Sequence, residues 1–92
     1  MANFIVSYDL NGSYPTHQKM DNHIRSLTSN CARLLESVWW VEFYGTPAEL
    51  FNKIYSVASP NDRLLVIEAN DGCATNLLVP VDALKEAWKT AA

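Results

Sequence analysis

The first ten residues constrain the fold of this chain more than any other segment. Alternation of apolar and polar side chains over residues 3–10 predicts a β-strand with one face in the core. An Asn-Gly-Ser turn follows at residues 11–13. Asp9 therefore stands at the carboxyl end of a strand, where the chain turns. The apolar face is Phe4, Val6, Tyr8 and Leu10, and the mixed face is Ile5, Ser7 and Asp9.

A helix is predicted after this turn, from Thr16 to about Leu27. Apolar residues recur there at steps of four and three, which places them on one face of a helix. That face carries Met20, Ile24 and Leu27. A second line of residues, at steps of four, is polar, and we interpret it as solvated helix surface. It consists of His17, Asp21 and Arg25.

Residues 46–49, Thr-Pro-Ala-Glu, are the clearest local signal in the chain. The side chain of Thr46 is placed to cap the amide of Glu49, and the side chain of Glu49 is placed to reach back to the amide of Thr46. Pro47 falls where a missing N–H costs nothing. We therefore expect a second helix that runs to about Ala58.

The sequence predicts β-strands in the segments outside these two helices, apart from a helix at the C-terminal end. Residues 31–44 are rich in Val, Trp, Phe and Tyr, so we expect strands at Ala32–Glu36 and Val38–Tyr44 with a bend near Ser37. A single long bent strand is the alternative, because no Gly or Pro marks the turn. Two further strands, Arg63–Ala69 and the short Thr75–Val79, precede a tail helix that carries Leu84, Ala87 and Trp88.

This order predicts an α+β fold for one domain over residues 1–92: a ferredoxin-like βαββαβ sandwich with a short C-terminal strand and a tail helix. Both crossover helices cover one face of the antiparallel sheet. The second face is too apolar to be left in water, so the tail helix, another subunit or both must cover it. We expect that face to hold Ile5, Ser7, Asp9, Val38, Trp40, Leu64 and Val66.

The composition and charge of the chain exclude some classes of protein function and favour others. The net charge is -3 and the seven basic residues are scattered, which excludes tight non-specific binding of duplex DNA. Hydrophobic residues make up 49% of this small domain, so part of its surface is expected to lie in a homodimer interface. With no export signal and no membrane-spanning segment, we expect a cytoplasmic protein in which Cys31 and Cys73 are reduced.

Asp9 has two interpretations. It is either a metal ligand or acid–base group at the end of a central strand, or it hydrogen-bonds the turn at residues 11–13. One carboxylate holds Mg²⁺ poorly, but a two-fold dimer would present two copies of Asp9 across its axis. His17 and His23 point in different directions on their helix and cannot share a metal. No catalytic signature surrounds Ser37, which from its own context is a turn or phosphate-contacting hydroxyl.

Two short motifs carry a resemblance to a known family. The strand ends in Ser7-Tyr8-Asp9-Leu10, and Glu36-Ser37-Val38-Trp39 follows after one helix. In this respect the chain resembles the small CRISPR-associated endonuclease family that forms the dimeric core of the spacer-integration complex. It is similar also to the related VapD ribonucleases and the SinR-like proteins. The resemblance covers roughly the first seventy residues, and the chain after Asp71 matches nothing in the family.

The resemblance implies a ferredoxin-like homodimer with Asp9 of each chain facing the two-fold axis. It implies a Mg²⁺-dependent endonuclease, a hydrolase of RNA or other single-stranded nucleic acid, in antiviral defence or a toxin-like setting. Asp9 would be a catalytic and metal-binding residue, Ser37 would be a second catalytic residue near the cleft, and Trp39 would be the core aromatic. The chain lacks the family's arginines after the aspartate, since its first basic residue is Lys19.

Two other functional classes remain open. One is a catalytically inactive homodimeric scaffold or regulator of the same fold, which the acidic net charge favours. The other is a protein that binds a small nucleotide between its subunits.

Overall fold

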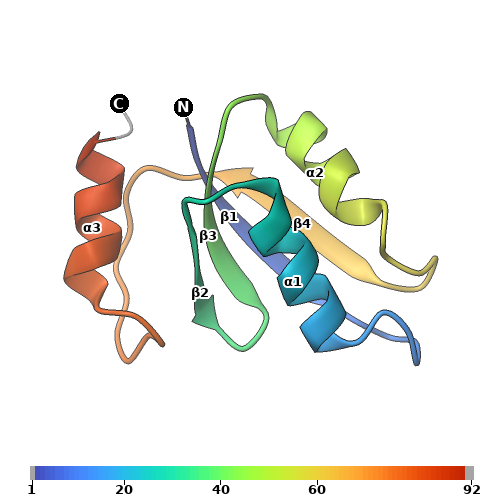
Figure 1. The fold of residues 1–92 in the computed structure, drawn as a ribbon. Coiled ribbons are helices and arrows are strands. Elements are labelled where there is room, and N and C mark those ends of the chain that lie inside the picture. Colours follow the sequence, from blue (N-terminus) through green and yellow to red (C-terminus); the bar gives the residue numbers. More distant parts are fainter. Residues whose placement is uncertain (1, 91–92) are drawn as a thin grey trace.

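The computed structural model describes residues 2–90, which form a four-stranded antiparallel sheet with three helices (Figure 1). The strands lie in the order β2-β3-β1-β4. This α+β arrangement is consistent with a ferredoxin-like fold. In chain order the elements are β1 (Ala2–Asp9), α1 (His17–Leu27), β2 (Cys31–Leu35), β3 (Val38–Phe43), α2 (Pro47–Tyr55), β4 (Arg63–Glu68) and α3 (Val81–Thr90).

The main core lies between one face of the sheet and the helices α1 and α2. The alternation predicted for β1 is confirmed, because Phe4, Val6 and Tyr8 are all buried there. Phe4 and Val6 are paired with residues of β3 and β4 that share this face, and Tyr8 is paired with Leu64 of β4. The buried cluster is Phe4, Val6, Tyr8, Met20, Ile24, Trp39, Val41, Phe43, Leu50 and Ile54.

Both predicted helix starts are confirmed. The hydroxyl of Thr16 accepts a hydrogen bond from the amide of Lys19 at 3.1 Å. At α2, the hydroxyl of Thr46 accepts from the amide of Glu49 at 3.1 Å, and the Glu49 carboxylate accepts from the amide of Thr46 at 3.0 Å. The capping box is therefore complete. The helix itself ends earlier than expected, at Tyr55.

The second face of the sheet is partly covered by α3, which lies on the side away from α1 and α2 (Figure 1). A polar contact ties the helix down: the buried side-chain amide of Asn3 donates to the carbonyl of Ala87 at 3.3 Å. The same Asn3 accepts a hydrogen bond from the indole N–H of Trp40. Leu84 of α3 is buried against this face, as is Leu34 of β2. Of the covers expected for this face, which were the tail helix, another subunit or both, the tail helix is present over part of it.

The predicted composition of the second face is wrong at β4. Val66 lies opposite Val6 and Leu64 lies opposite Tyr8, so both side chains point toward α1 and α2. Leu65 and Ile67 point to the second face instead. Both alternating sets of β4 are apolar, so the sequence of this strand does not say which set is buried.

The predicted strand at residues 75–79 is absent from the part of the chain that the structure describes. Asn76 has a φ of 55°, a left-handed conformation that interrupts extended backbone. One backbone hydrogen bond remains, from the amide of Leu78 to the carbonyl of Leu34 at 2.9 Å. The segment therefore runs beside the outer edge of β2 without forming a ladder.

Between β2 and β3 the chain makes a two-residue turn at Glu36 and Ser37, so the two-strand interpretation of residues 31–44 is confirmed. Cys31 and Cys73 are both free thiols. Over residues 2–90, each helix is too short or too polar to cross a lipid bilayer.

Candidate functional site

Asp9 lies exposed at the carboxyl end of β1, on the second face of the sheet. Its side chain is 61% exposed, and one carboxylate oxygen lies 3.4 Å from a guanidinium nitrogen of Arg63, which is 81% exposed. Arg63 is the residue directly opposite Asp9 in the β1–β4 pair. An ion pair so exposed contributes about 1 kcal/mol or less, and either partner is free to exchange for another ion.

The turn after β1 is held by a different aspartate. The carboxylate of Asp62 accepts hydrogen bonds from the amides of Asn11 and Ser59, each at 2.8 Å. The side chain of Asn11 adds a 2.8 Å bond to the carbonyl of Asn61. These backbone donors hold the pKa of Asp62 below its ordinary value. The turn is thus stabilised without the side chain of Asp9, which is paired with Arg63.

Ser37 comes close to Asp9 along the backbone. The amide of Tyr8 donates to the carbonyl of Ser37 at 3.1 Å, which places the β2–β3 turn beside the residue that precedes Asp9. The two motifs that carry the family resemblance therefore meet at one end of the sheet. Next to Asp9, on the β4 side, is a shallow hollow of about 160 Å³. Its lining is Ser7, Tyr8, Asp9, Arg63, Leu64 and Leu65.

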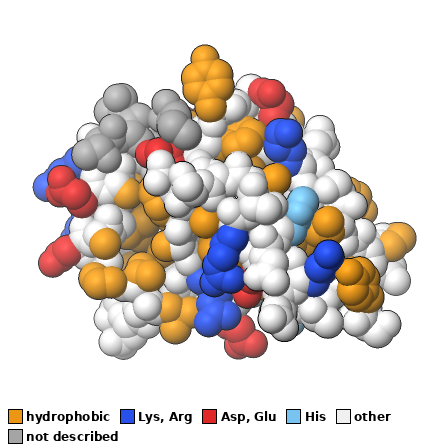
Figure 2. All heavy atoms as spheres, viewed as in Figure 1, with side chains coloured by type: hydrophobic (Ala, Val, Ile, Leu, Met, Phe, Trp, Pro, Cys, Tyr) orange, Lys and Arg blue, Asp and Glu red, His pale blue; other side chains and the backbone are white. Residues whose placement is uncertain are grey.

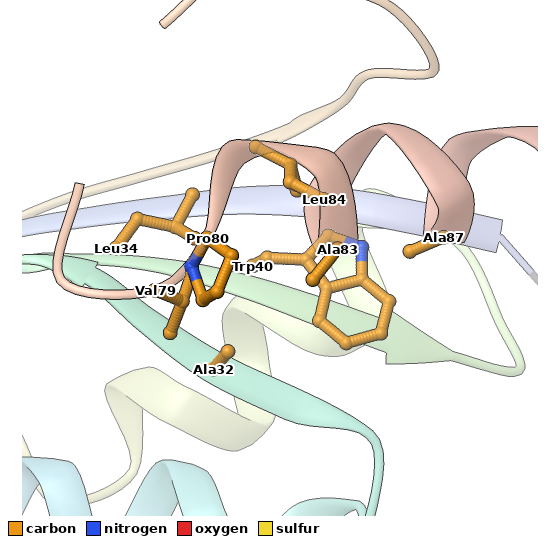
Figure 3. A pocket seen from close by; sticks show the side chains of 8 residues that line it. All are labelled: Ala32, Leu34, Trp40, Val79, Pro80, Ala83, Leu84 and Ala87. Carbon is orange, nitrogen blue, oxygen red and sulfur yellow. The ribbon is translucent and has the colours of Figure 1, made fainter. Parts of the chain in front are cut away.

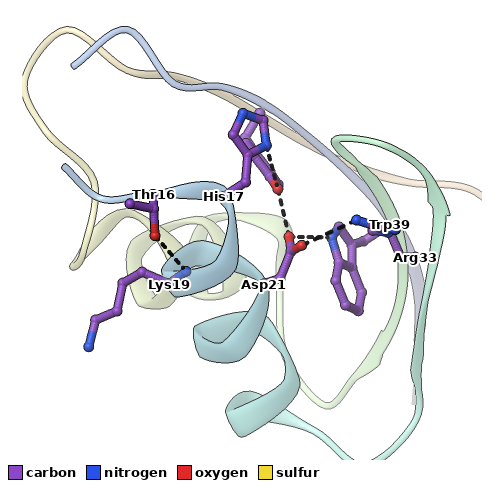
Figure 4. Close-up of polar contacts among 7 residues, drawn as sticks. Thr16, His17, Lys19, Asp21, Arg33 and Trp39 are labelled. Carbon is purple, nitrogen blue, oxygen red and sulfur yellow. Dashed lines mark hydrogen bonds and ion pairs between the residues drawn. The ribbon is translucent and has the colours of Figure 1, made fainter. Parts of the chain in front are cut away.

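A buried polar network lies beneath α1, on the other face of the sheet (Figure 4). Its centre is the carboxylate of Asp21, which is buried. The hydroxyl of Tyr8 donates to Asp21 Oδ1 at 2.6 Å, and the indole N–H of Trp39 donates to the same oxygen at 3.2 Å. Arg33 lies 3.6 Å from the other oxygen. The interpretation of Asp21 as solvated helix surface is therefore wrong.

The network constrains the proton positions of its members. Burial is the main cause that raises the pKa of Tyr8 well above its ordinary value, and the hydrogen bond to Asp21 acts in the same direction. The one hydroxyl proton of Tyr8 goes to Asp21, so at the 3.4 Å contact with His17 the Nδ1–H of that ring donates. The sequence signal for this network was the four-residue step from His17 to Asp21, together with the inward position of Tyr8.

His23 makes a separate contact on the next turns of α1. Its Nε2 lies 2.7 Å from the carbonyl oxygen of Lys53, so it joins α1 to α2. The prediction that His17 and His23 do not act together is consistent with these positions, because each ring contacts a different part of the molecule.

Basic side chains gather only locally. Arg25 lies 4.9 Å from the ring centroid of Trp39, and Arg33 lies beside Asp21, so both surround the same buried pair. On the face shown in Figure 2, a short stripe of basic side chains occupies the centre, with acidic atoms beside it. The remaining basic groups on that face are scattered. On this face, such a distribution does not provide the continuous row of cations that a nucleic-acid backbone requires.

An apolar hollow lies between α3 and the sheet (Figure 3). It encloses about 290 Å³ and has the indole of Trp40 as one wall. It offers no charged group, so it does not have the polar groups that orient a substrate. Its lining is Ala32, Leu34, Trp40, Val79, Pro80, Ala83, Leu84 and Ala87.

The residues that the structure describes around Asp9 in one chain do not fit Mg²⁺. That ion prefers an octahedral shell of oxygens, usually with two carboxylates or phosphates. Asp9 brings one carboxylate, and its neighbour Arg63 is a cation. Over residues 2–90 no three or more His, Cys, Asp and Glu side chains are grouped closely enough to hold a metal ion. A divalent cation at Asp9 would need a second carboxylate from another subunit.

Comparison with known proteins leaves the family open: no family model matches the chain, and no curated protein matches it. The resemblance to the CRISPR-associated endonucleases and the VapD and SinR-like proteins stays a prediction.

Proposed function

We propose that this protein is a ferredoxin-like homodimeric scaffold, which acts by binding and not by catalysis. The observation that carries this proposal is the apolar surface of β4. Leu65 is 56% exposed and Ile67 is 44% exposed, side by side on the second face of the sheet. Neighbouring apolar side chains left in water on a sheet face are typical of a protein–protein interface.

Charge supports a binding role. The carboxylate of Asp9 is paired with Arg63, which lies directly opposite it on β4. The chain as a whole carries a net charge of -3. A phosphate backbone approaching Asp9 would therefore meet a carboxylate and a cation, Arg63, that is already paired.

The ferredoxin-like assignment rests on the strand order β2-β3-β1-β4 and on the two crossover helices, α1 and α2, that share one face. In such a fold the second face is open to a partner. Here α3 covers the side near Asn3 and leaves Leu65 and Ile67 exposed.

Sedimentation velocity of the purified chain over a concentration series tests the homodimer. We expect a dimer whose dissociation constant rises at least tenfold in Leu65→Asp, because a charge then enters the apolar contact. Leu78→Asp is the matched control, since Leu78 is equally exposed but lies outside β4. A wild-type chain that stays monomeric throughout the series overturns the proposal.

A second candidate is the metal-dependent endonuclease that the family resemblance implies, with Asp9 as its metal ligand and Ser37 nearby. One observation favours it: the hydrogen bond between Tyr8 and Ser37 brings the two family motifs together at one end of the sheet. The candidate requires Asp9 of two subunits to meet at the dimer axis, because one chain does not fit Mg²⁺.

Cleavage assays separate the two candidates. Wild type, Asp9→Asn and the control Asp82→Asn are incubated with single-stranded RNA and with duplex DNA, in Mg²⁺ or Mn²⁺. If the protein is a scaffold, we expect the same background level of nucleic-acid cleavage in all three proteins. Cleavage that is lost in Asp9→Asn and kept in Asp82→Asn establishes the nuclease and rejects the purely binding role.

A further inference from the structure

The two edges of the sheet differ in whether another segment of the chain lies beside them. At the β2 edge, the segment after β4 returns alongside, and the amide of Leu78 donates to the carbonyl of Leu34 at 2.9 Å. At the other edge is β4, which pairs only with β1 within residues 2–90 (Figure 1). One edge is thus partly covered and the other is open.

The open edge presents a defined set of backbone groups. The amide of Ala69 donates to the carbonyl of Asn3 at 3.0 Å, in the same register that pairs β4 with β1. Alternate residues of an antiparallel ladder point their backbone groups in opposite directions. The N–H and C=O groups of Leu65 and Ile67 therefore point to β1. Those that point outward belong to Leu64, Val66 and Glu68.

This edge lacks the features that usually prevent strands from pairing. The sequence of β4, Arg-Leu-Leu-Val-Ile-Glu, contains no proline and no lysine. Its register with β1 is continuous from Arg63 to Glu68, so no bulge bends it away. An open, regular and apolar edge of this kind is a template for another strand.

The strand is also complementary to itself. It carries a cation at its start, Arg63, and an anion at its end, Glu68. Antiparallel pairing with a second copy brings the cationic end of each strand to the anionic end of the other. Parallel pairing would bring like charges together, which is unfavourable.

We propose that two copies of this chain pair antiparallel through their β4 edges, with the two-fold axis at Val66, to form one continuous sheet. In this register Leu64 pairs with Glu68 of the partner subunit through outward backbone groups. Leu65 then lies opposite Ile67 of the partner subunit on the second face. Each subunit contributes both residues, so the exposed apolar side chains form one four-residue cluster.

The inference deepens the proposed homodimer and rests on it. It also bears on the nuclease candidate. Two copies of Asp9 would be separated by three strand spacings across the sheet and six residues along it, roughly 25 Å in all. Carboxylates that far apart cannot share a cation. A face-to-face dimer, which would bring the two Asp9 side chains together, is the competing arrangement.

Amide hydrogen exchange measured by NMR tests the edge pairing on the unmodified chain. In the edge-paired dimer the outward N–H groups of Leu64, Val66 and Glu68 are hydrogen-bonded, so their exchange slows as concentration rises through the dissociation constant. In a face-to-face dimer they stay exposed and exchange fast at every concentration. A dimer in which they exchange fast overturns the edge pairing but keeps the homodimer, whereas a monomer removes both.

A matched pair of variants gives a second, independent test. Glu68→Pro removes an outward N–H from each subunit without affecting the β1–β4 ladder, because that N–H does not point to β1. Glu68→Ala removes only the charge. We expect Glu68→Pro to raise the dissociation constant at least tenfold more than Glu68→Ala, with circular dichroism confirming that both fold. Equal dissociation constants for the two variants contradict the proposal.

Discussion

The hydroxyl of Tyr8 donates a 2.6 Å hydrogen bond to the carboxylate of Asp21, and so joins the central strand β1 to the helix α1 inside the core. A buried carboxylate is costly unless its oxygens are hydrogen-bonded. Here Trp39 donates to the same oxygen and Arg33 lies beside the other. The network fixes the position of α1 on the sheet, and its loss has measurable consequences.

Replacement of Tyr8 by phenylalanine keeps the ring and removes only the hydroxyl. Because hydrogen bonds to charged groups contribute about 1.5–3 kcal/mol, we expect the free energy of unfolding to fall by about 2 kcal/mol. Urea unfolding followed by circular dichroism measures it. Tyr55→Phe on the surface of α2 is the control, and a loss no larger than the control's would show that the buried bond adds nothing.

The raised pKa of Tyr8 predicts a stability change at alkaline pH. The unfolded tyrosine loses its proton near its ordinary pKa of 10.0, while the folded one still holds it. The contribution is complete below that pH and is lost as pH rises toward the folded pKa, at about 1.4 kcal/mol per pH unit. We expect wild type to lose stability above about pH 10 more steeply than Tyr8→Phe. If the stability of the two proteins falls with pH at the same rate, the raised pKa of Tyr8 is contradicted.

The capping box of α2 predicts that substitutions at its two residues, Thr46 and Glu49, cause coupled losses of stability. We expect Thr46→Ala to lower the free energy of unfolding by about 1 kcal/mol, because the amide of Glu49 loses its acceptor. Glu49→Ala removes the reciprocal bond to the amide of Thr46. In a double-mutant cycle the second change costs less once the first is made. Thr75→Ala, in an exposed loop, provides the baseline, and strictly additive losses would argue against a reciprocal box.

Leu84 is the buried anchor of α3 on the second face. We expect Leu84→Ala to release the helix from the sheet, because it enlarges the hollow that Leu84 shares with Trp40. The indole N–H resonance of Trp40 reports the release, since its hydrogen bond goes to Asn3, which also holds α3. The exposed Leu78 serves as the control in Leu78→Ala. An unchanged Trp40 resonance in Leu84→Ala would mean that α3 docks without this side chain.

Prediction from sequence succeeded where short-range chemistry decides the outcome. The start of α2 depends on four consecutive residues, 46–49, which carry both hydrogen bonds of the box. The inner face of β1 depends on strict alternation along one strand. In both cases the residues that interact, or that share a face, are set by chain geometry alone.

Prediction from sequence failed where one residue pattern is compatible with two positions of a side chain or two conformations of the backbone. Asp21 occupies a polar line on α1, yet it turns inward because Tyr8 and Trp39 supply donors from neighbouring strands. Asn76 interrupts a segment whose composition is that of a strand. The donors to Asp21 lie on strands outside α1, and the backbone angle of Asn76 leaves no signal in the neighbouring residues.

By itself, the sequence determined the order of the elements from β1 to β4 and the place of Asp9 at a strand end, because these follow from periodicity and caps within a few residues. Only the tertiary structure decided which apolar set of β4 faces outward, and that Asp9 is paired with Arg63. Both depend on the register between β1 and β4, strands more than fifty residues apart in the chain. A shift of that register by one residue would exchange the buried and exposed faces, so the pairing, and not the local pattern, sets the surface on which function depends.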